Sequence, residues 1–229
     1  MKSYFITGTD TDVGKTFVTA GLASSMKKMG INIGIMKPFA AGTIDNNGYK
    51  SNDVNLLSEA AQITDEEQLV NPYFFPIQAS PFTAMQNLSV SIDVEIVLNN
   101  FKKLAGLHDA LLVEGIGGIM TPILKNYFVT NLIKEMNLET IVVTSSRIGT
   151  INHTIMTIKM CQEFGINIRG IIINNVNLTG YPVNELKRDI EELTGNSVLG
   201  SIPYSKNWNL DNISEIISNK INVKSLLEE

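Results

Sequence analysis

Gly8-Thr9-Asp10-Thr11-Asp12-Val13-Gly14-Lys15-Thr16 is the segment from which the architecture of this chain follows. The apolar run Tyr4–Thr7 comes directly before it, and the helical pattern Lys15–Met29 begins at its end. A strand, a loop of small residues ending in Gly-Lys-Thr and a helix are typical of a phosphate-binding loop, in which backbone N–H groups surround the phosphates. In such a loop Lys15 reaches the outer phosphates and the Thr16 hydroxyl binds Mg²⁺.

The loop departs in one place from the strict pattern G-x-x-x-x-G-K-[ST]. Thr9 occupies the position of the first glycine, and Gly8 comes one residue early. The alternative is an ordinary glycine-rich turn with a chance Lys-Thr, but the position between a strand and a helix favours the phosphate loop. Some phosphate-loop ATPases carry an extra lysine early in the loop, which acts across a dimer interface. This chain has Asp10 at the corresponding position, which argues against the partitioning and arsenical-pump type of ATPase.

Short apolar runs alternate with amphipathic stretches along the chain. The predicted strands are Tyr4–Thr7, Ile31–Met36, Ala110–Glu114, Thr140–Thr144, Gly170–Ile173 and Val198–Ile202. The predicted helices are Lys15–Met29, Ile92–Leu104, Ile151–Phe164 and Val183–Leu193. Strands of this kind, alternating with helices, predict an α/β fold with a doubly wound, mainly parallel sheet and helices on both faces. The proline-containing segment Asn71–Val90 is predicted to be a long loop.

Length, charge and cysteine content limit the classes of protein to which this chain can belong. The chain has 229 residues, 44 % of them hydrophobic, which predicts one α/β domain spanning residues 1–229. The net charge is 18 − 23 = −5, which argues against a nucleic-acid binder. Cys161 is the one cysteine and excludes an internal disulfide. No apolar run suggests a membrane span or a signal peptide, so we expect a cytoplasmic protein.

Polar residues follow several of the predicted strands, where ligands bind in open parallel sheets. Lys37 either faces the ligand or extends to water, and Asp53 either faces the ligand or caps a helix. Glu114 ends a buried strand beside glycines, the usual position of a Mg²⁺ ligand in phosphate-loop enzymes. Asn174 and Asn175 either bind an adenine edge or mark a turn. His108 is predicted to be an exposed loop residue and Cys161 a core residue.

Taken together, these residues resemble the dethiobiotin synthetase family, over almost the whole chain. The resemblance rests on the loop at residues 8–16, Lys37-Pro38 with Gly42, Asn52-Asp53, Asn71-Pro72-Tyr73, Ser80-Pro81, Val113-Glu114-Gly115, Gly149 with Ile151-Asn152-His153, and Ile202-Pro203. It implies an ATP- and Mg²⁺-dependent ligase that joins CO₂ to 7,8-diaminononanoate and closes the ureido ring. The implied route runs through a carbamate and its phosphorylated mixed anhydride, and it releases ADP and phosphate.

The resemblance also implies roles for individual residues. The implied catalytic residues are Lys15 and Lys37, and the implied Mg²⁺ ligands are Thr16, Asp53 and Glu114. The implied ATP site comprises Asp12, Val13, Gly14, Lys15, Thr16, Phe17, Asp53, Glu114, Gly115, Ile116, Gly117, Asn174, Asn175, Pro203, Tyr204 and Ser205. The implied substrate contacts are Thr11, Asp12, Lys37, Ala41, Gly149, Thr150 and Asn152, the last three from the second subunit of a homodimer.

Three positions depart from the family pattern. Ala41 stands where the family often has a substrate-binding serine, with Thr43 two residues on; Ile116 replaces a common alanine, and Asp12 a commoner glutamate. Two alternatives therefore stay open. One is another phosphate-loop ligase that acts on a different acid or amine, and the other is a nucleotide-switch ATPase that uses ATP to dimerise and to release a partner protein.

Overall fold

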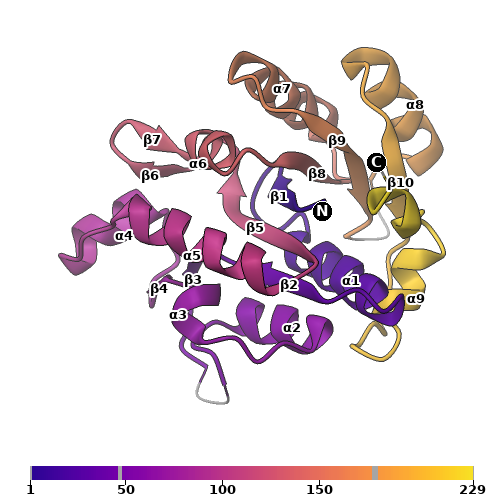
Figure 1. The fold of residues 1–229 in the computed structure, drawn as a ribbon. Helices are drawn as coiled ribbons and strands as arrows, with labels where there is room; N and C mark the ends of the chain where they lie inside the picture. Colours follow the sequence, from indigo (N-terminus) through magenta and orange to yellow (C-terminus); the bar gives the residue numbers. More distant parts are fainter. Residues whose placement is uncertain (1, 46–47, 177–179, 229) are drawn as a thin grey trace.

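A twisted parallel sheet forms the centre of the protein (Figure 1). The structure is a computed structural model that describes residues 2–45, 48–176 and 180–228. The strands of the sheet are β1 (Tyr4–Gly8), β2 (Ile33–Met36), β5 (Ala110–Gly118), β8 (Glu139–Ser145), β9 (Ile168–Asn174) and β10 (Val198–Ile202). They lie in the order β10-β9-β8-β1-β5-β2, and every pair is parallel. All carboxyl ends therefore meet at one edge.

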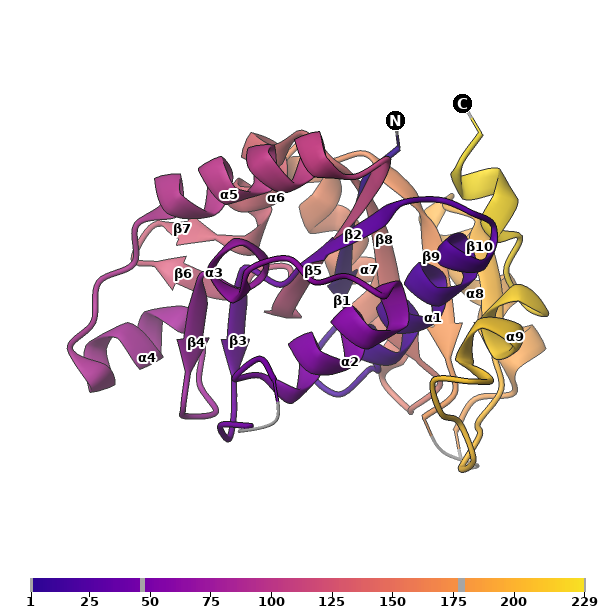
Figure 2. The same ribbon diagram turned by 60° about the horizontal axis from the view of Figure 1, so that its bottom comes forward.

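Helices cover both faces of this sheet (Figure 2). One face carries α1 (Lys15–Lys28), α2 (Asn52–Ala61) and α9 (Ile213–Ser218), and the other carries α5 (Val94–Leu107), α6 (Val129–Met136), α7 (Thr150–Glu163) and α8 (Val183–Thr194). The period of two along β1 shows why: Tyr4 and Ile6 pack on the α1 side, and Phe5 packs on the α5 side. The predicted doubly wound α/β architecture is confirmed.

The predicted strands and helices are all present, with shifted ends. The main difference is β5, which continues past Glu114 to Gly118. Its register against β1 changes there, because Ile6 pairs with Glu114 whereas Gly8 pairs with Gly118. The glycines after Glu114 therefore form a bulge in the strand at the edge where ligands bind.

The prediction of a long loop over Asn71–Val90 is wrong. This segment contains β4 (Tyr73–Phe75), which pairs in parallel with β3 (Phe39–Ala41), and α4 (Pro81–Leu88). Ser80 caps α4 and Pro81 is its first residue, so this proline starts a helix rather than breaking one.

Short elements complete the described part of the chain. They are α3 (Glu67–Val70), the antiparallel pair β6 (Pro122–Leu124) and β7 (Tyr127–Phe128), and the 3₁₀ helix Val223–Leu226. Among the described residues, no helix is long and apolar enough to cross a membrane.

His108 differs from its predicted exposure. Its side chain is only 8 % exposed, at the end of α5. Its ring nitrogens lie 3.1 Å from Asn32 Oδ1 and 3.0 Å from Asp65 Oδ2. Cys161, in contrast, is buried as predicted.

The contact between α1 and α9 depends on a glycine in the middle of a helix. A Cβ atom added at Gly21 would lie 2.1 Å from Cγ1 of Ile217 on α9. Both positions are buried, and Ile217 is branched at Cβ, so its side chain cannot easily rotate away from an added methyl group. The absence of a side chain at Gly21 allows α9 to pack on α1.

Replacement of Gly21 by alanine is predicted to destabilise the fold by up to about 2 kcal/mol. Overpacking costs about 1–3 kcal/mol, which exceeds the gain of about 1 kcal/mol in helix propensity. Gly106→Ala in α5 is the matched control, because a Cβ there meets no atom within 4 Å; it should stabilise by about 0.4–1 kcal/mol. Urea unfolding measures both, and a stabilising Gly21→Ala would contradict this packing.

Candidate active site

The phosphate loop is held against the end of β9. Gly14, the N-cap of α1, has φ 86°, and a Cβ atom on it would lie 2.0 Å from Nδ2 of Asn174. That same Nδ2 atom donates a hydrogen bond of 3.0 Å to the carbonyl oxygen of Val13. The positive φ and the close approach both require glycine at position 14.

Thr9 is accommodated because it continues β1 rather than forming the turn. Its N–H donates to the carbonyl oxygen of Val143 at 2.9 Å, and its hydroxyl lies 3.2 Å from Oγ1 of Thr144. Thr144 Oγ1 in turn lies 2.6 Å from Oγ1 of Thr150 and 2.9 Å from Oγ1 of Thr154. These hydroxyls connect the loop to β8 and to the start of α7.

Lys15 extends back across the loop that it follows. Its Nζ donates to the carbonyl oxygen of Asp10 at 2.9 Å, and the residue is 8 % exposed. Burial is the main cause that lowers the pKa of Lys15 to about 8, against the opposing effect of the Glu114 carboxylate. The Lys15 ammonium is therefore weakly solvated and available to an incoming anion.

Lys37 joins two carboxylates, and the three side chains are named here the lysine–carboxylate cluster. Lys37 follows β2, and its Nζ lies 2.6 Å from Oδ2 of Asp53 and 2.5 Å from Oε1 of Glu114. The backbone of Lys37 is fixed as well, because its N–H donates to Val70 and its carbonyl oxygen accepts from Nδ2 of Asn71. β2, α2 and β5 thus meet at one buried charge.

The alternative role of Asp53 as a helix cap is wrong. Ser51 is the N-cap of α2 and its side chain accepts from the N–H of Val54. Asp53 lies in the first turn, and its carboxylate pairs with Lys37. Burial would raise the pKa of Asp53, but the charge of Lys37 outweighs it and lowers that pKa. Burial would likewise lower the pKa of Lys37, but Glu114 and Asp53 together raise it.

Glu114 has one carboxylate oxygen engaged and one unused. Oε1 accepts hydrogen bonds from Thr16 Oγ1, at 2.8 Å, and from Lys37. Oε2 is buried and has no hydrogen-bond partner among the described residues. A buried, unsatisfied carboxylate oxygen is costly unless a cation or donor joins it. The oxygens of Thr16, Asp53 and Glu114 therefore fit a hard divalent cation such as Mg²⁺.

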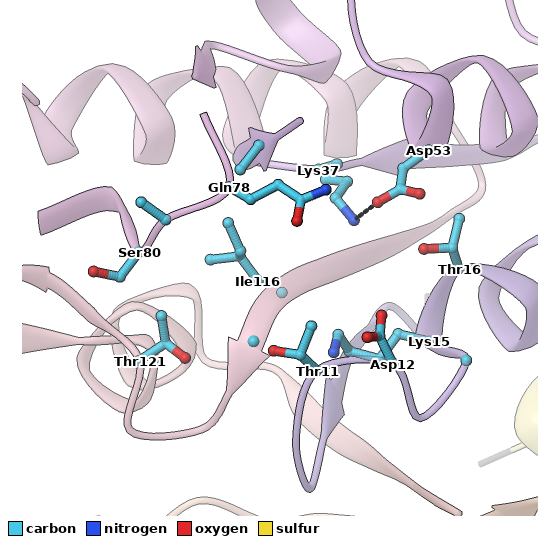
Figure 3. A pocket seen from close by; sticks show the side chains of 15 residues that line it. Thr11, Asp12, Lys15, Thr16, Lys37, Asp53, Gln78, Ser80, Ile116 and Thr121 are labelled. Atoms are coloured by element: carbon cyan, nitrogen blue, oxygen red, sulfur yellow. Dashed lines mark hydrogen bonds and ion pairs between the residues drawn. The ribbon is translucent and has the colours of Figure 1, made fainter. Parts of the chain in front are cut away.

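These groups line a cavity of about 680 Å³ at the carboxyl edge of the sheet (Figure 3). The cavity brings together the predicted residues Thr11, Asp12, Gly14, Lys15, Thr16, Lys37, Ala41, Asp53, Gly115, Ile116 and Gly117. Thr11 and Asp12 of the phosphate loop lie on one side of it, and Lys37 lies on the other. Glu114 does not line the cavity itself, but its carboxylate accepts hydrogen bonds from the lining side chains of Thr16 and Lys37.

The predicted adenine residues lie outside this cavity, at the neighbouring strand ends. The N–H of Asn175 donates to the carbonyl oxygen of Ile202 at 2.9 Å, so the segment Pro203-Tyr204-Ser205 starts beside the end of β9. Phe17 of α1 packs edge-on against Trp208, with ring centroids 5.0 Å apart. Asn174 holds the phosphate loop through Val13, a structural role that the sequence alone left open.

The predicted substrate residues of α7 also lie outside the cavity. Gly149 is the N-cap of this helix, and Asn152 is exposed in its first turn. Thr150 is 2 % exposed and its hydroxyl bonds Thr144, so its side chain faces the core. Within this chain, the start of α7 and the cavity are separate.

Four cavity residues were not predicted from the sequence as site residues: Gln78, Ala79, Ser80 and Thr121. Ser80-Pro81 is a helix-start pattern that could have placed Ser80 before a helix. Gln78 has no such local signal, because its position depends on the pairing of β3 with β4.

Comparison with known proteins gives separate evidence on the family to which this chain belongs. A family model described as an AAA domain matches residues 2–210. The ATP-dependent dethiobiotin synthetase of Nitrosopumilus maritimus is 57 % identical over 100 % of both chains. That of Bacillus subtilis is 32 % identical over 100 % of this chain and 99 % of the relative. This chain belongs to the dethiobiotin synthetase family. The resemblance carried by its motifs is confirmed.

Solved structures support the fold of this dethiobiotin synthetase family member. A ParA family ATPase from Chlorobium tepidum superposes with a TM-score of 0.56, at 18 % identity over 100 % of this chain and 95 % of the other. The MinD protein of Pyrococcus horikoshii gives 0.51, also at 18 % identity, over 99 % and 90 %. Both confirm a phosphate-loop NTPase-like fold, whereas the full-length likeness to synthetases favours the ligase over the switch ATPase.

Nucleotide affinity is predicted to fall as the pH rises through 8. A phosphate anion at Lys15 would bind the protonated form of this side chain, whose pKa is about 8. The protonated fraction drops about tenfold between pH 7 and pH 9, and the affinity for ATP should drop with it. Isothermal titration calorimetry without metal measures this. Lys15→Met should bind weakly at both pH values, and an affinity of the unaltered protein that ignores pH would contradict the assignment.

Proposed function

We propose that this chain forms dethiobiotin from 7,8-diaminononanoate, CO₂ and ATP, releasing ADP and phosphate. The observation that carries the proposal is the convergence of Lys15 and Lys37, from separate elements, on one cavity. Membership of the dethiobiotin synthetase family supplies the substrates.

The reaction needs positive charge more than a base. Carboxylation of one amine gives a carbamate, whose oxygen attacks the γ-phosphorus of ATP while ADP leaves. The uncharged second amine then attacks the carbamate carbon, the C–O bond to phosphate breaks, and the ring closes as one amine proton leaves with the phosphate. The carbamate is already an anion, and none of the described residues lining the cavity is a histidine. Lys15 and Lys37 stabilise the two anions as they approach each other.

Thr16, Asp53 and Glu114 would hold Mg²⁺, which when bound supplies charge to the nucleotide phosphates. The unused Oε2 of Glu114 supports this assignment. Lys37 pairs with both carboxylates. Once their charge is neutralised, Lys37 would leave them and turn its ammonium toward the carbamate. The cluster thus brings the proposed catalytic cation to the place where the proposed metal ligands meet.

The remaining ATP contacts are assigned to the neighbouring strand ends. Gly115, Ile116 and Gly117 follow Glu114 along the cavity wall and approach the phosphates. Phe17, Asn175 and the segment Pro203-Tyr204-Ser205 would line the adenine. Asn174 serves the same site indirectly, by holding Val13 and packing against Gly14.

The working unit is proposed to be a homodimer. The start of α7 offers the N–H groups of Ile151 and Asn152, which are free of helical partners in the first turn and favour a carboxylate. Gly149 opens that turn, and the flanking Ile148 and Met156 are 86 % and 51 % exposed. Thr11 and Asp12 contact the diamine from within the subunit, and the partner's helix start would bind its carboxylate. The protein would act in the cytoplasm as one α/β domain over residues 1–229.

Removal of Lys37 is predicted to reduce turnover about 100-fold, or about 3 kcal/mol, while ATP affinity is kept. The measurement is ADP release with 7,8-diaminononanoate, with and without bicarbonate. Lys15→Ala should lose nucleotide affinity as well, because Lys15 faces the phosphates. Lys134→Ala, at an exposed site on α6, is the control.

Two outcomes of this assay separate the two levels of the proposal. ADP release by the unaltered protein that needs neither the diamine nor bicarbonate would overturn the function. Nearly normal turnover in Lys37→Ala would overturn only the role of Lys37.

The dimer is tested at the start of α7. Asn152→Tyr should raise the KM for the diamine several-fold with little change in the KM for ATP, because it crowds the proposed carboxylate site. Gln162→Tyr, exposed at the other end of the same helix, should change neither. Sedimentation velocity gives the mass of both, and a fully active monomer would refute the proposal.

A further inference from the structure

Gln78 lies in the cavity at a point that the family pattern does not explain. It follows β4 in the segment that leads to α4, and it lines the cavity with Lys37 and Ala41. In Figure 3 the amide lies on the same side of the cavity as Lys37, across from Thr11 and Asp12. The side chain thus faces the space that the reacting end of a substrate would occupy.

The Gln78 amide is uncommitted, unlike the neighbouring hydroxyls. Ser80 Oγ donates to Thr83 and caps α4, and Thr121 Oγ1 accepts from the N–H of Gly118. Thr16 Oγ1 donates to Glu114. Among the described residues, the amide of Gln78 has no hydrogen-bond partner, so it is free to bind a ligand.

The backbone on both sides of Gln78 is fixed. Tyr73 stacks between Phe39 and Phe75, with ring centroids 5.6 Å and 6.4 Å away. The N–H of Gly42 donates to the carbonyl oxygen of Phe75, which ties the end of β4 to β3. On the other side, Ser80 is locked as the cap of α4. Gln78 is therefore presented to the cavity from a short span between two anchored points.

The chemistry of ring closure calls for a neutral acceptor at this position. The attacking amine must be unprotonated, and a carboxylate beside it would favour the unreactive ammonium form. An amide oxygen accepts an N–H bond without adding charge. On the Lys37 side of the cavity, Ala41 and Ile116 are apolar and Lys37 is a donor, whereas the carboxylate of Asp12 lies on the opposite side. Gln78 is thus suited to hold an uncharged amine.

We propose that Gln78 is a specificity-determining residue, whose amide oxygen accepts a hydrogen bond from the amine that closes the ring. This inference rests on the proposed function, because it takes the diamine as the ligand. It assigns to Gln78 the recognition of the second amine, the feature that distinguishes a diamine from a monoamine.

The test compares Gln78→Ala with the unaltered protein on three ligands: 7,8-diaminononanoate, 7-aminononanoate and 8-aminononanoate. Calorimetric Kd values should rise about 3- to 10-fold for the diamine, the loss expected for one neutral hydrogen bond. One monoamine should show the same loss. The other, which lacks the contacted amine, should bind both proteins equally. Gln86→Ala, exposed on α4, should leave all three Kd values unchanged.

Gln78→Glu tests the requirement for neutrality. It should bind the diamine at least as tightly but turn over more slowly at pH 7, with the rate recovering as the pH rises. The carboxylate raises the pKa of the amine, which then needs a higher pH to lose its proton. The charged side chains lining the cavity, Asp12, Lys15, Lys37 and Asp53, are common to both proteins. Both profiles are recorded at saturating ATP and compared with that of Gln78→Ala, which adds no charge beside Lys37.

The outcomes separate this inference from the function on which it rests. An unaltered protein that neither binds nor converts the diamine overturns the proposed function. A functional enzyme whose Gln78→Ala variant binds the diamine normally overturns the role of Gln78. An equal loss for all three ligands also overturns it, because that would indicate a general change in the cavity. Matching pH profiles of Gln78→Glu and the unaltered protein overturn the requirement for a neutral acceptor.

Discussion

The ammonium of Lys37, held between the carboxylates of Asp53 and Glu114, is the interaction on which the site depends. Glu114 is fully buried and Lys37 is 4 % exposed, so neither charge can be left alone without a large desolvation cost. Pairing brings the end of β2, the first turn of α2 and the middle of β5 to one point. The glycine bulge directly after Glu114 then carries β5 along the cavity wall.

A second set of neutral contacts fixes the opposite wall. Asn174 holds the phosphate loop at Val13, and the hydroxyl of Thr9 joins it to Thr144 on β8. The cavity therefore lies between the lysine–carboxylate cluster and the phosphate loop, both positioned by the same parallel sheet. The proposed chemistry brings two anions together: the phosphates would bind at the loop, and the carbamate would meet Lys37.

The sequence predicts well what depends on local pattern and poorly what depends on pairing between distant segments. Lys37 and Glu114 could be predicted because each follows a buried parallel strand, whose carboxyl end faces the ligand edge. Asp53 could not be decided locally, since a cap and an ion-pair partner look alike until Ser51 is seen to cap α2. Gln78 could not be predicted as a site residue. It reaches the cavity only because β3 pairs with β4, in a segment predicted to be a loop.

A crystal structure with Mg²⁺, a non-hydrolysable ATP analogue and the diamine would test the lysine–carboxylate cluster most directly. The prediction is that Glu114 Oε2 would bind the metal, with Thr16 and Asp53 completing the protein ligands. Nζ of Lys37 should have left both carboxylates for the substrate. A metal bound without Glu114, with Lys37 still between the two carboxylates, would contradict the proposed use of this ion pair.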